Sequence, residues 1–343
     1  MPVPTRQVVK EALLVGVSYV TNTNLNENGF PIQAGAHKDM MSLRRLLTRR
    51  YDYRDEDITT LVDSEDTPHE SWPTRDNIIR AMKKLIAGKQ AGDHIVFSFS
   101  GHGGQVRALV DIYEVDGMDE ILLPVDCTFD PEAEAPDNFV NFIRDDEIRD
   151  IFVNQLAEGV RCTMIFDCCH SGTASDLPNV EEFSPVTTPD SPLFSPRSTA
   201  PRAPRAFAQM ETLHDGHTDS APYMWPTARS AYPPSFRYFD KDVTSWSACL
   251  DDGITFGKKS GGIFMKAFTQ VLHSTPNLTH KELLKYLRKH IFHVTEEENQ
   301  KLEERRKSDV LSRESDLFED YVAPRPQLGS LRPDSILLAP FTL

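Results

Sequence analysis

Residues 160–172 read VRCTMIFDCCHSG, an apolar run that ends in two adjacent cysteines and a histidine. A short apolar run of this kind is typical of a buried strand. Because side chains alternate across a strand, Asp167 and Cys169 are expected on one face. Phe166 and Cys168 are then expected on the opposite face. The stretch therefore predicts a strand that delivers Cys169 together with a carboxylate, while Cys168 turns toward the interior.

A second apolar run, HIVFSFSGHGG at residues 94–104, ends in the same manner. Alternation places Ser100 and, if the extension continues, His102 on one face, with two phenylalanines on the other. Glycines follow both runs and let the backbone approach a ligand closely. In a parallel sheet, functional residues collect beyond the carboxyl ends of the strands. If the two strands are neighbours, His102 and Cys169 meet at that edge.

The residues at these two strand ends permit three interpretations. In the first, His102 generates or stabilises the thiolate of Cys169, and the N–H groups of Gly103 and Cys169 bind the oxyanion of an acyl-transfer reaction. In the second, both cysteines are small buried hydrophobes and His102 is an ordinary loop histidine. A zinc site of Cys168, Cys169 and His170 is the third, and it is disfavoured because adjacent cysteines chelate poorly.

Short apolar runs alternate with helical patterns through the first half of the chain. Strands are expected at residues 12–20, 58–62, 94–100, 120–126 and 160–167. Helices are expected at residues 37–50, 74–88 and 144–157. This order predicts right-handed crossovers and an α/β fold, with a mostly parallel central sheet covered by helices on both faces.

The composition changes between residues 177 and 238, where eleven of the 24 prolines of the chain lie. Such a segment cannot bury enough apolar surface to offset its ordering entropy, so a flexible insertion or linker is expected. Order is expected to return afterwards. The pattern predicts a strand near residues 244–252, helices at 261–273 and 279–294, a solvated charged helix or loop at 295–320, and a final strand at 335–343.

Composition and charge exclude several classes of protein. The formal net charge of −15 disfavours general affinity for nucleic acid, which needs a basic surface. Basic peptides or metal cations are favoured partners, although an acidic surface also serves solubility alone. No stretch approaches the roughly 20 apolar residues that span a bilayer, so no membrane association is expected. Five cysteines form an odd, sparse set, which indicates a reducing, intracellular compartment.

Taken together, the motifs resemble those of the metacaspases, the caspase-related cysteine peptidases of fungi, plants and protists. The matching stretches are PTRDNIIRAMKKL, SGHGGQ, DGMDEILLPVD, RDDEIRDI, DCCHSG followed by SDLP, and RPQLGS. The resemblance implies a caspase-like α/β sandwich. It divides the chain into a large-subunit-like region (1–176), the insertion (177–238) and a small-subunit-like region (239–343) that completes the same domain. The type expected is similar to type I without its Pro- or Gln-rich N-terminal extension.

The resemblance also assigns catalytic roles. His102 matches the catalytic histidine of the family, and in the family's D-x-C-H-S-G pattern the cysteine before the histidine is the nucleophile, which is Cys169 here. Cys168 occupies a variable position. The implied function is a cysteine endopeptidase that acts on protein or peptide substrates through an acyl-enzyme. The alternative is a caspase-fold scaffold or regulatory partner without proteolytic activity.

Specificity for arginine or lysine before the cleaved bond is a further implication. The positions that match the acidic primary pocket of the family are Asp39, Ser100 and Asp167, and a carboxylate there would pair with a guanidinium or ammonium group. Ala36 replaces a cysteine of the family pattern. The small-subunit motif DDGITFG (251–257) also departs from the family, which leaves remote specificity pockets undefined.

The resemblance implies calcium as an activator. The positions that match the aspartate cluster of the family are Asp119, Asp145, Asp146 and Asp176. Hard oxygen ligands suit calcium, and converging carboxylates repel one another without a cation. The alternative is that these acids cap a helix or face solvent.

A cytoplasmic or nuclear monomer is expected.

Self-cleavage in the insertion is a further hypothesis. A peptidase that selects basic residues could cut its own chain, and the insertion carries Arg197, Arg202 and Arg205. Exposed arginines are common without such a role.

Overall fold

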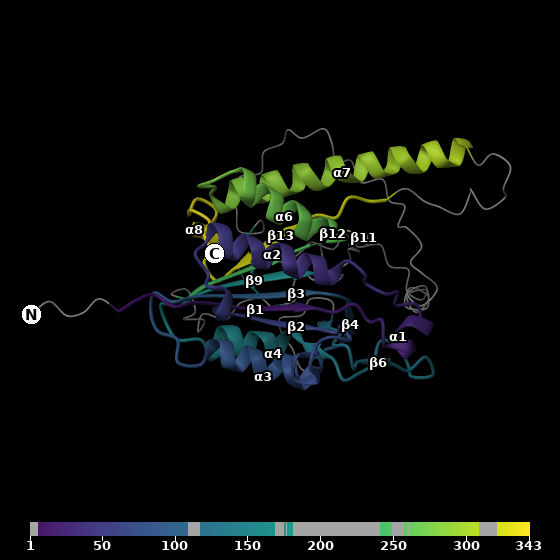
Figure 1. Ribbon diagram of the computed structural model, residues 1–343, viewed down its shortest axis with the longest axis horizontal. Helices are drawn as coiled ribbons and strands as arrows, with labels where there is room; N and C mark the ends of the chain where they lie inside the picture. Colours follow the sequence, from purple (N-terminus) through teal and green to yellow (C-terminus); the bar gives the residue numbers. More distant parts are fainter. Residues whose placement is uncertain are drawn as a thin grey trace, which may run out of the picture.

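A six-stranded sheet forms the centre of the computed structural model (Figure 1), and its strands lie in the order β13-β10-β9-β3-β1-β2. Its strands are β1 (Lys10–Gly16), β2 (Ile58–Val62), β3 (His94–Ser100), β9 (Arg161–Asp167), β10 (Asp242–Ser247) and β13 (Gln327–Ser330). All neighbouring pairs are parallel except β10 and β13, which are antiparallel. The expected mostly parallel central sheet is confirmed.

The structure describes residues 6–108, 117–168, 175, 177–180, 241–248, 257–258, 261–308 and 321–343. Within these ranges, no helix is long and apolar enough to cross a membrane. Most of the segment expected to be an insertion, residues 177–238, lies outside the description. Its first residues are described: Val180 donates its N–H to Leu328 of β13 at 3.0 Å, and Leu177 is buried.

One face of the sheet is covered by α3 (Arg75–Ile86) and α4 (Asp145–Arg149), which continues in a π-helical turn (Asp150–Asn154). Thr74 begins α3 by accepting a hydrogen bond from the Asn77 N–H. Ile78, Met82 and Leu85 then recur at helical spacing and are buried against the sheet. Because fully burying one such side chain contributes about 1.5–3 kcal/mol, this apolar stripe fixes the helix on the sheet.

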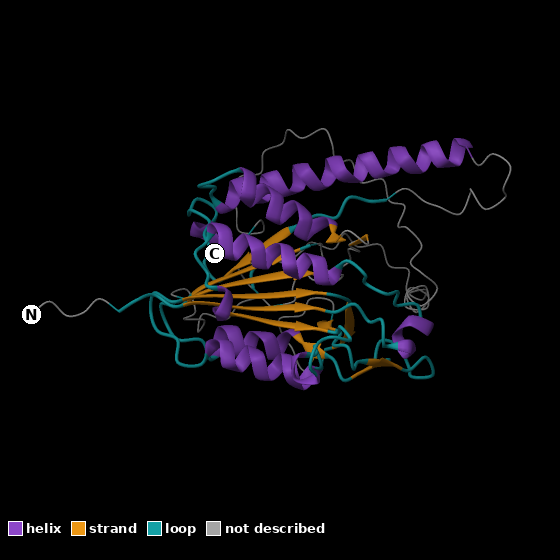
Figure 2. Ribbon diagram, in the orientation of Figure 1, coloured by secondary structure: helices purple, strands orange, loops and turns teal. Residues whose placement is uncertain are grey.

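The opposite face is covered by α2 (Ala36–Arg50), α6 (Ile263–Ser274), α7 (His280–Ser308) and α8 (Pro333–Ile336). Figure 2 shows helices above and below the strands, so the expected two-sided covering is confirmed. Trp246 of β10 lies at the centre of this second core, with its ring 5.9 Å from Phe268 of α6. α6 starts at a glycine and α7 runs on into the charged segment, whose remainder beyond residue 308 is outside the described ranges.

Of two further strand expectations, one is confirmed as a strand but in another sheet, and one is wrong. Residues 120–126 do not join the central sheet: β5 (Met118–Leu122) lies in a small antiparallel sheet with β4 (Gly103–Arg107) and β8 (Ile143–Arg144). The final residues, 335–343, do not form a strand. Their first two residues end the short helix α8, whose first residue is Pro333, and the others follow it. Apolar runs of this length do not distinguish helix, strand and buried coil.

The remaining described elements are short. They are α1 (Thr23–Glu27), the 3-10 turns Asp55–Asp57 and His69–Ser71, and the strands β6 (Thr128–Phe129), β7 (Phe139–Val140), β11 (Gly257–Lys258) and β12 (Gly261–Gly262).

Candidate active site

The carboxyl ends of the parallel strands meet at one edge, on the right in Figure 1. β3 and β9 are neighbours, and their register pairs Ser100 with Asp167. The same serine is paired on its other side with Gly16 of β1. The expectation that the two motif-bearing strands lie side by side is therefore confirmed. Cys169 is two residues beyond the end of β9 and lies outside the described residues.

His102 is placed by contacts rather than by strand alternation, because β3 ends at Ser100. Its ring centroid lies 4.7 Å from that of Tyr19 and 5.7 Å from that of Phe30. Its Nε2 is 2.8 Å from the carbonyl oxygen of Pro31, and the side-chain amide of Gln33 lies 3.4 Å from both ring nitrogens. An N–H at Nε2 that donates to Pro31 leaves Nδ1 as the acceptor of a proton.

The histidine is neutral at physiological pH. It is 8% exposed, and this burial lowers its pKa to about 4, although the hydrogen bond to Pro31 acts in the opposite direction. Desolvation disfavours the charged imidazolium. A neutral imidazole with one unprotonated nitrogen is the form that a general base requires.

The cysteine that the sequence assigned to the interior is indeed buried. Cys168 has no exposed surface and belongs to the core cluster that also contains Phe166, whereas Ile165 belongs to the cluster on the other face. His170 lies outside the described residues, as does Cys169. Gly103 is buried and begins β4 opposite Leu122.

Two buried carboxylates converge near this edge. The backbone N–H of Gly262 donates to both carboxylate oxygens of Asp39, at 2.9 and 2.8 Å. Asp167 accepts from the N–H of Met265 at 3.0 Å. A Cβ added to Gly262 would lie only 2.3 Å from Oδ2 of Asp167, so both carboxylates flank the same glycine. The structure thus brings together Asp39 and Asp167, which the sequence placed in one pocket.

The electrostatics of this pair are unfavourable without a cation. Burial raises the pKa of Asp39 to about 8, with the charge of Asp167 as the next contribution, and the Gly262 hydrogen bonds lower it only in part. Burial also raises the pKa of Asp167 to about 6. Two interacting carboxyls titrate as a pair. A guanidinium or ammonium group placed between them would favour their charged forms.

Ser100 completes this acidic pocket, which we define as Asp39, Ser100 and Asp167. It is 2% exposed, and its hydroxyl has no hydrogen-bond partner among the described residues. α2 reaches this position because Gly16 lacks a side chain: a Cβ there would lie 3.0 Å from the carbonyl oxygen of Ala36. Gly16 therefore lets the first turn of α2, with Asp39, approach the end of β1.

Sequence reasoning missed the two glycines that close the pocket from the small-subunit-like region. Gly261 has φ of +120°, and a Cβ there would lie 2.4 Å from Oδ1 of Asp39. Gly262 is the N-cap of α6, with its N–H directed at the same carboxylate. The signal available in the sequence was the glycine pair immediately before an apolar helix, since glycine is required where backbone approaches another group closely.

Three of the four aspartates expected to bind metal lie together. The carboxylate oxygens of Asp119, Asp145 and Asp146 come within 4.8 Å of one another. Asp145 accepts hydrogen bonds from the N–H groups of Glu120 and Asp146, each at 2.8 Å. Asp119 also forms an ion pair with Arg144. This set of oxygen donors fits calcium, and Asp176, the fourth expected ligand, is outside the described residues.

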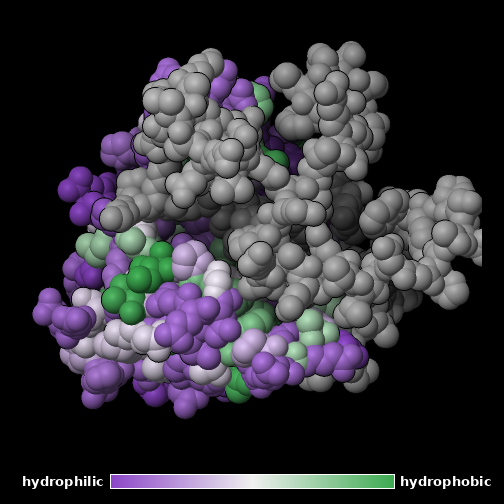
Figure 3. Space-filling model, turned by 90° about the vertical axis from the view of Figure 1, so that its right-hand side faces the viewer, coloured by the Kyte–Doolittle hydropathy of each residue, from purple (hydrophilic) through white to green (hydrophobic). Residues whose placement is uncertain are grey.

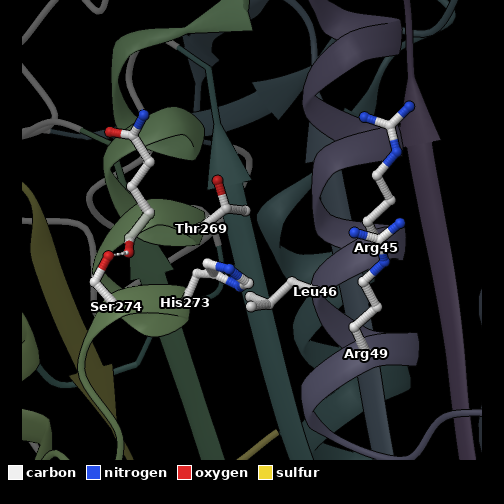
Figure 4. A pocket seen from close by; sticks show the side chains of 7 residues that line it. Arg45, Leu46, Arg49, Thr269, His273 and Ser274 are labelled. Carbon is white, nitrogen blue, oxygen red and sulfur yellow. Dashed lines mark hydrogen bonds between the residues drawn. The ribbon is translucent and has the colours of Figure 1, made fainter.

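A separate pocket of about 230 Å³ lies between α2 and α6 (Figure 4). Arg45 and Arg49 line it from α2, and Thr269 and His273 project from α6 toward them. Arg45 is six residues beyond Asp39, which is about 9 Å along a helix. This pocket is therefore distinct from the strand ends that carry the acidic pair.

Figure 3 looks onto the edge where the strands end. Among the described residues, a group of hydrophobic side chains lies within a largely hydrophilic surface.

The fold is an α/β sandwich, a mostly parallel six-stranded sheet between two layers of helices, in which His102 lies just beyond β3, the neighbour of β9. A family model described as "Metacaspase, peptidase C14 domain" matches residues 10–178. Metacaspase-1 of Pyricularia oryzae is 33% identical over 292 residues, which cover 81% of this chain and 67% of that protein. The chain belongs to the metacaspase family, which is a family of cysteine-type endopeptidases.

Two other similar proteins are also metacaspases. Metacaspase-1 of Schizosaccharomyces pombe is 30% identical over 83% of this chain, and the match spans 64% of that protein. Metacaspase-1B of Aspergillus fumigatus is 40% identical over 171 residues, half of this chain and 37% of its own length. The chain thus spans about two thirds or less of the length of these relatives.

Two solved structures are similar at low identity. Caspase-1 from Spodoptera frugiperda has a TM-score of 0.48 and 10% identity over 96% of this chain and 93% of its own. A protein from Geobacter sulfurreducens has a TM-score of 0.47 and 20% identity over 82% of this chain and 88% of its own.

Proposed function

We propose that this chain is a calcium-stimulated cysteine endopeptidase that cleaves peptide bonds after arginine or lysine. The observation that carries the proposal is the pair of buried carboxylates, Asp39 and Asp167, beside the buried hydroxyl of Ser100. Uncompensated charges in such a place are costly, so a pocket of this kind is suited to a cationic side chain. Ser100 is paired with Asp167 in the sheet, and His102 follows Ser100 by two residues in the sequence.

Acylation is proposed to start at Cys169. Its sulfur attacks the carbonyl carbon of the substrate while Nδ1 of His102 takes the thiol proton. The N–H groups of Gly103 and Cys169 would hold the oxyanion of the tetrahedral intermediate. The C–N bond then breaks, His102 gives its proton to the leaving amine, and a thioester remains on Cys169. The neutral state of His102 supports this role.

Deacylation uses the same histidine. Nδ1 of His102 takes a proton from water as the water oxygen attacks the thioester carbon. When the C–S bond breaks, the proton returns to the sulfur of Cys169, and the product with a C-terminal arginine or lysine leaves. The hydrogen bond from Nε2 of His102 to Pro31 holds one ring orientation in both halves of the reaction.

Selection of a basic residue is assigned to the acidic pocket. A guanidinium can form two parallel hydrogen bonds with a carboxylate and still reach a second acceptor. In our proposal, the cation competes with the N–H of Gly262 for Asp39 and converts the protonated Asp39 carboxyl into a carboxylate beside that of Asp167. A proton is therefore released when substrate binds near neutral pH.

Calcium is proposed to act at the aspartate cluster rather than at the thiol. Asp119, Asp145 and Asp146 would hold the ion, with Asp176 as a fourth ligand. When bound, calcium would neutralise the repulsion among these carboxylates and tie β5 to the start of α4. Arg144 pairs with Asp119 in the structure and would have to share that carboxylate.

We further propose a cytoplasmic or nuclear monomer that can cut itself. The odd, sparse set of cysteines supports a reducing compartment. The candidate sites of self-cleavage, Arg197, Arg202 and Arg205, lie outside the described residues. The acidic net charge offers no support for a nucleic-acid partner.

The test is an assay of a fluorogenic peptide with arginine before the reporter, with and without calcium. Cys169→Ala should abolish hydrolysis, whereas Cys168→Ala should retain it to within a few-fold, because Cys168 is buried in the core. Asp145→Asn should lose the response to calcium and keep residual activity, because the thiol and the histidine are unchanged.

Other results would separate the parts of the proposal. Hydrolysis that survives Cys169→Ala, or that is lost equally in both cysteine variants, would reject the assigned nucleophile. A parent enzyme that ignores calcium would remove the metal from the account and spare the dyad. A folded parent that cleaves no basic peptide would favour the non-proteolytic scaffold.

A further inference from the structure

The phenol of Tyr19 ties together the backbone on both sides of His102. Its oxygen accepts a hydrogen bond from the N–H of His102 at 2.8 Å and donates to the carbonyl of Leu123 at 2.5 Å. The N–H of Leu123 in turn donates to the carbonyl of His102 at 3.1 Å. Tyr19 therefore holds the backbone N–H of His102, and Leu123, the residue after β5, holds its carbonyl.

The aromatic ring of Tyr19 adds a direct contact. It has no exposed surface, and its centroid lies 4.7 Å from that of the His102 imidazole, at an interplanar angle of 39°. Gly101 makes this approach possible, because a Cβ there would lie 2.8 Å from the phenol oxygen. Because Gly101 has no side chain, the phenol of Tyr19 fits beside the backbone there, and the Tyr19 ring packs against the imidazole of His102.

Tyr19 itself is held in an uncommon backbone conformation. Its φ is +60°, which lies in the left-handed region and is unfavourable for a bulky residue. The buried carboxylate of Asp63 offsets this by accepting from the N–H of Tyr19 at 2.7 Å, and from the N–H and hydroxyl of Ser18 at 2.7 and 2.9 Å. His37, in the first turn of α2, contacts the same carboxylate at 2.7 Å.

We propose that Tyr19, oriented by Asp63, is a positioning residue for His102 in the reaction. The inference rests on the proposed function and extends it beyond the dyad and the acidic pocket. A general base must lie within hydrogen-bond reach of the thiol, and a displacement of about 1 Å can cost two orders of magnitude in rate. Asp63 also contacts α2 through His37, so one carboxylate connects the helix that carries Asp39 with the residue that fixes His102.

The first test is Tyr19→Phe, with Tyr53→Phe as the matched control. Tyr53 is also buried, and its hydroxyl has no hydrogen-bond partner among the described residues, so its loss should leave kcat within twofold of the parent. Tyr19→Phe keeps the ring but releases the His102 amide, and kcat for the arginine peptide should fall about tenfold to a hundredfold. KM should stay within twofold, because the acidic pocket is not touched. Thermal unfolding identifies variants that do not fold.

A second variant distinguishes positioning from general weakening. Asp63→Asn keeps the phenol but replaces the carboxylate that accepts the Tyr19 N–H, so kcat should fall severalfold in this variant too. If both residues act through His102, the double variant should lose little more than Tyr19→Phe alone, whereas independent damage would multiply. Asp63→Asn also serves as the test if Tyr19→Phe does not fold.

A spectroscopic measurement is independent of activity. NMR of imidazole-labelled protein, with the His102 signal assigned by its disappearance in His102→Gln, should show a changed resonance and titration in Tyr19→Phe and no change in Tyr53→Phe. An unchanged His102 signal with kcat within twofold of the parent would overturn the inference. If the parent cleaves no peptide, the proposed function fails, and the NMR result alone decides whether Tyr19 fixes His102.

Discussion

Burial disfavours the charged form of Asp39, which is the form that a cationic substrate would need in the proposed function. Asp39 is 6% exposed, faces a second buried carboxylate, and accepts two hydrogen bonds from one backbone N–H. Burial and the charge of Asp167 keep it protonated near neutral pH. Because the folded chain holds Asp39 protonated and the unfolded chain does not, this residue makes the free energy of unfolding depend on pH.

The stability of the folded chain should depend on pH through Asp39. The pKa of Asp39 is raised to about 8, so between about pH 4 and pH 8 the folded chain holds a proton that the unfolded chain releases. The free energy of unfolding must therefore fall as pH rises through that window. In Asp39→Asn, the loss of unfolding free energy between pH 5 and pH 8 should be smaller than in the parent by on the order of 2 kcal/mol.

Urea denaturation at pH 5, 6.5 and 8 measures this effect. Asp55→Asn is the control, because Asp55 is an exposed carboxylate whose pKa is lowered by its hydrogen bond with Arg44. Equal slopes in the parent and Asp39→Asn would show that Asp39 is not held protonated.

Individual residues were predictable from the sequence to different degrees. Strand alternation and neighbouring parallel strands suffice to bring Ser100 next to Asp167, and the structure has them in register. Asp39 came only from the family resemblance, because its position depends on how closely α2 approaches Gly16. Tyr19 gave no signal at all, since a tyrosine at the end of an apolar strand is usually a core residue.

At the scale of elements, the start of α6 is the piece that completes the acidic pocket. The helix was predicted from its apolar spacing, but the role of the two glycines before it was not. Gly262 and Met265 each direct a backbone N–H at a pocket carboxylate. Helix N-termini favour negative charge in this way. The position of this helix start therefore sets the geometry of the acidic pocket, and with it the substrate selection that we propose.

Gly262→Ala tests that dependence. The added methyl group would lie 2.3 Å from Oδ2 of Asp167, so either the carboxylate or the start of α6 must move. We expect KM for the arginine peptide to rise at least about tenfold, the loss of one good ionic contact of about 1.4 kcal/mol.

The control for Gly262→Ala is Gly88→Ala, at the end of α3. It has a φ of +69° and open space around the added atom, so it should lower stability without changing KM. A KM unchanged in Gly262→Ala would contradict the pocket as described.

Element types were largely predictable, and the errors have a common physical cause. Long periodic segments such as α2, α3 and α6 fall where the spacing of apolar residues indicates. Residues 335–343 were misassigned as a strand, because short apolar runs fit several structures equally well. Residues 120–126 were expected as a strand and their first part does form one in β5, but its small separate sheet was not predicted. Only tertiary pairing, β5 with β4 and the α8 segment with the second core, decides these two cases.

For the molecule as a whole, the acidic pocket unites distant parts of the chain. Asp39 and Gly262 are 223 residues apart, and the insertion lies between them in sequence. The large-subunit-like region supplies His102, Asp39, Ser100 and Asp167, and the region after the insertion closes the pocket. In the function that we propose, a change in the placement of α6 would therefore act on substrate binding.

In the proposed function, the thiol of Cys169 acts beside a pocket that selects a positive charge. Labelling with an arginyl chloromethyl ketone in calcium, followed by mass spectrometry of the digested protein, tests both parts at once. We expect one label, on Cys169, that is lost in Asp39→Asn and absent with a norleucyl probe of similar length. Label on Cys168, or equal labelling by the neutral probe, would contradict the proposed function.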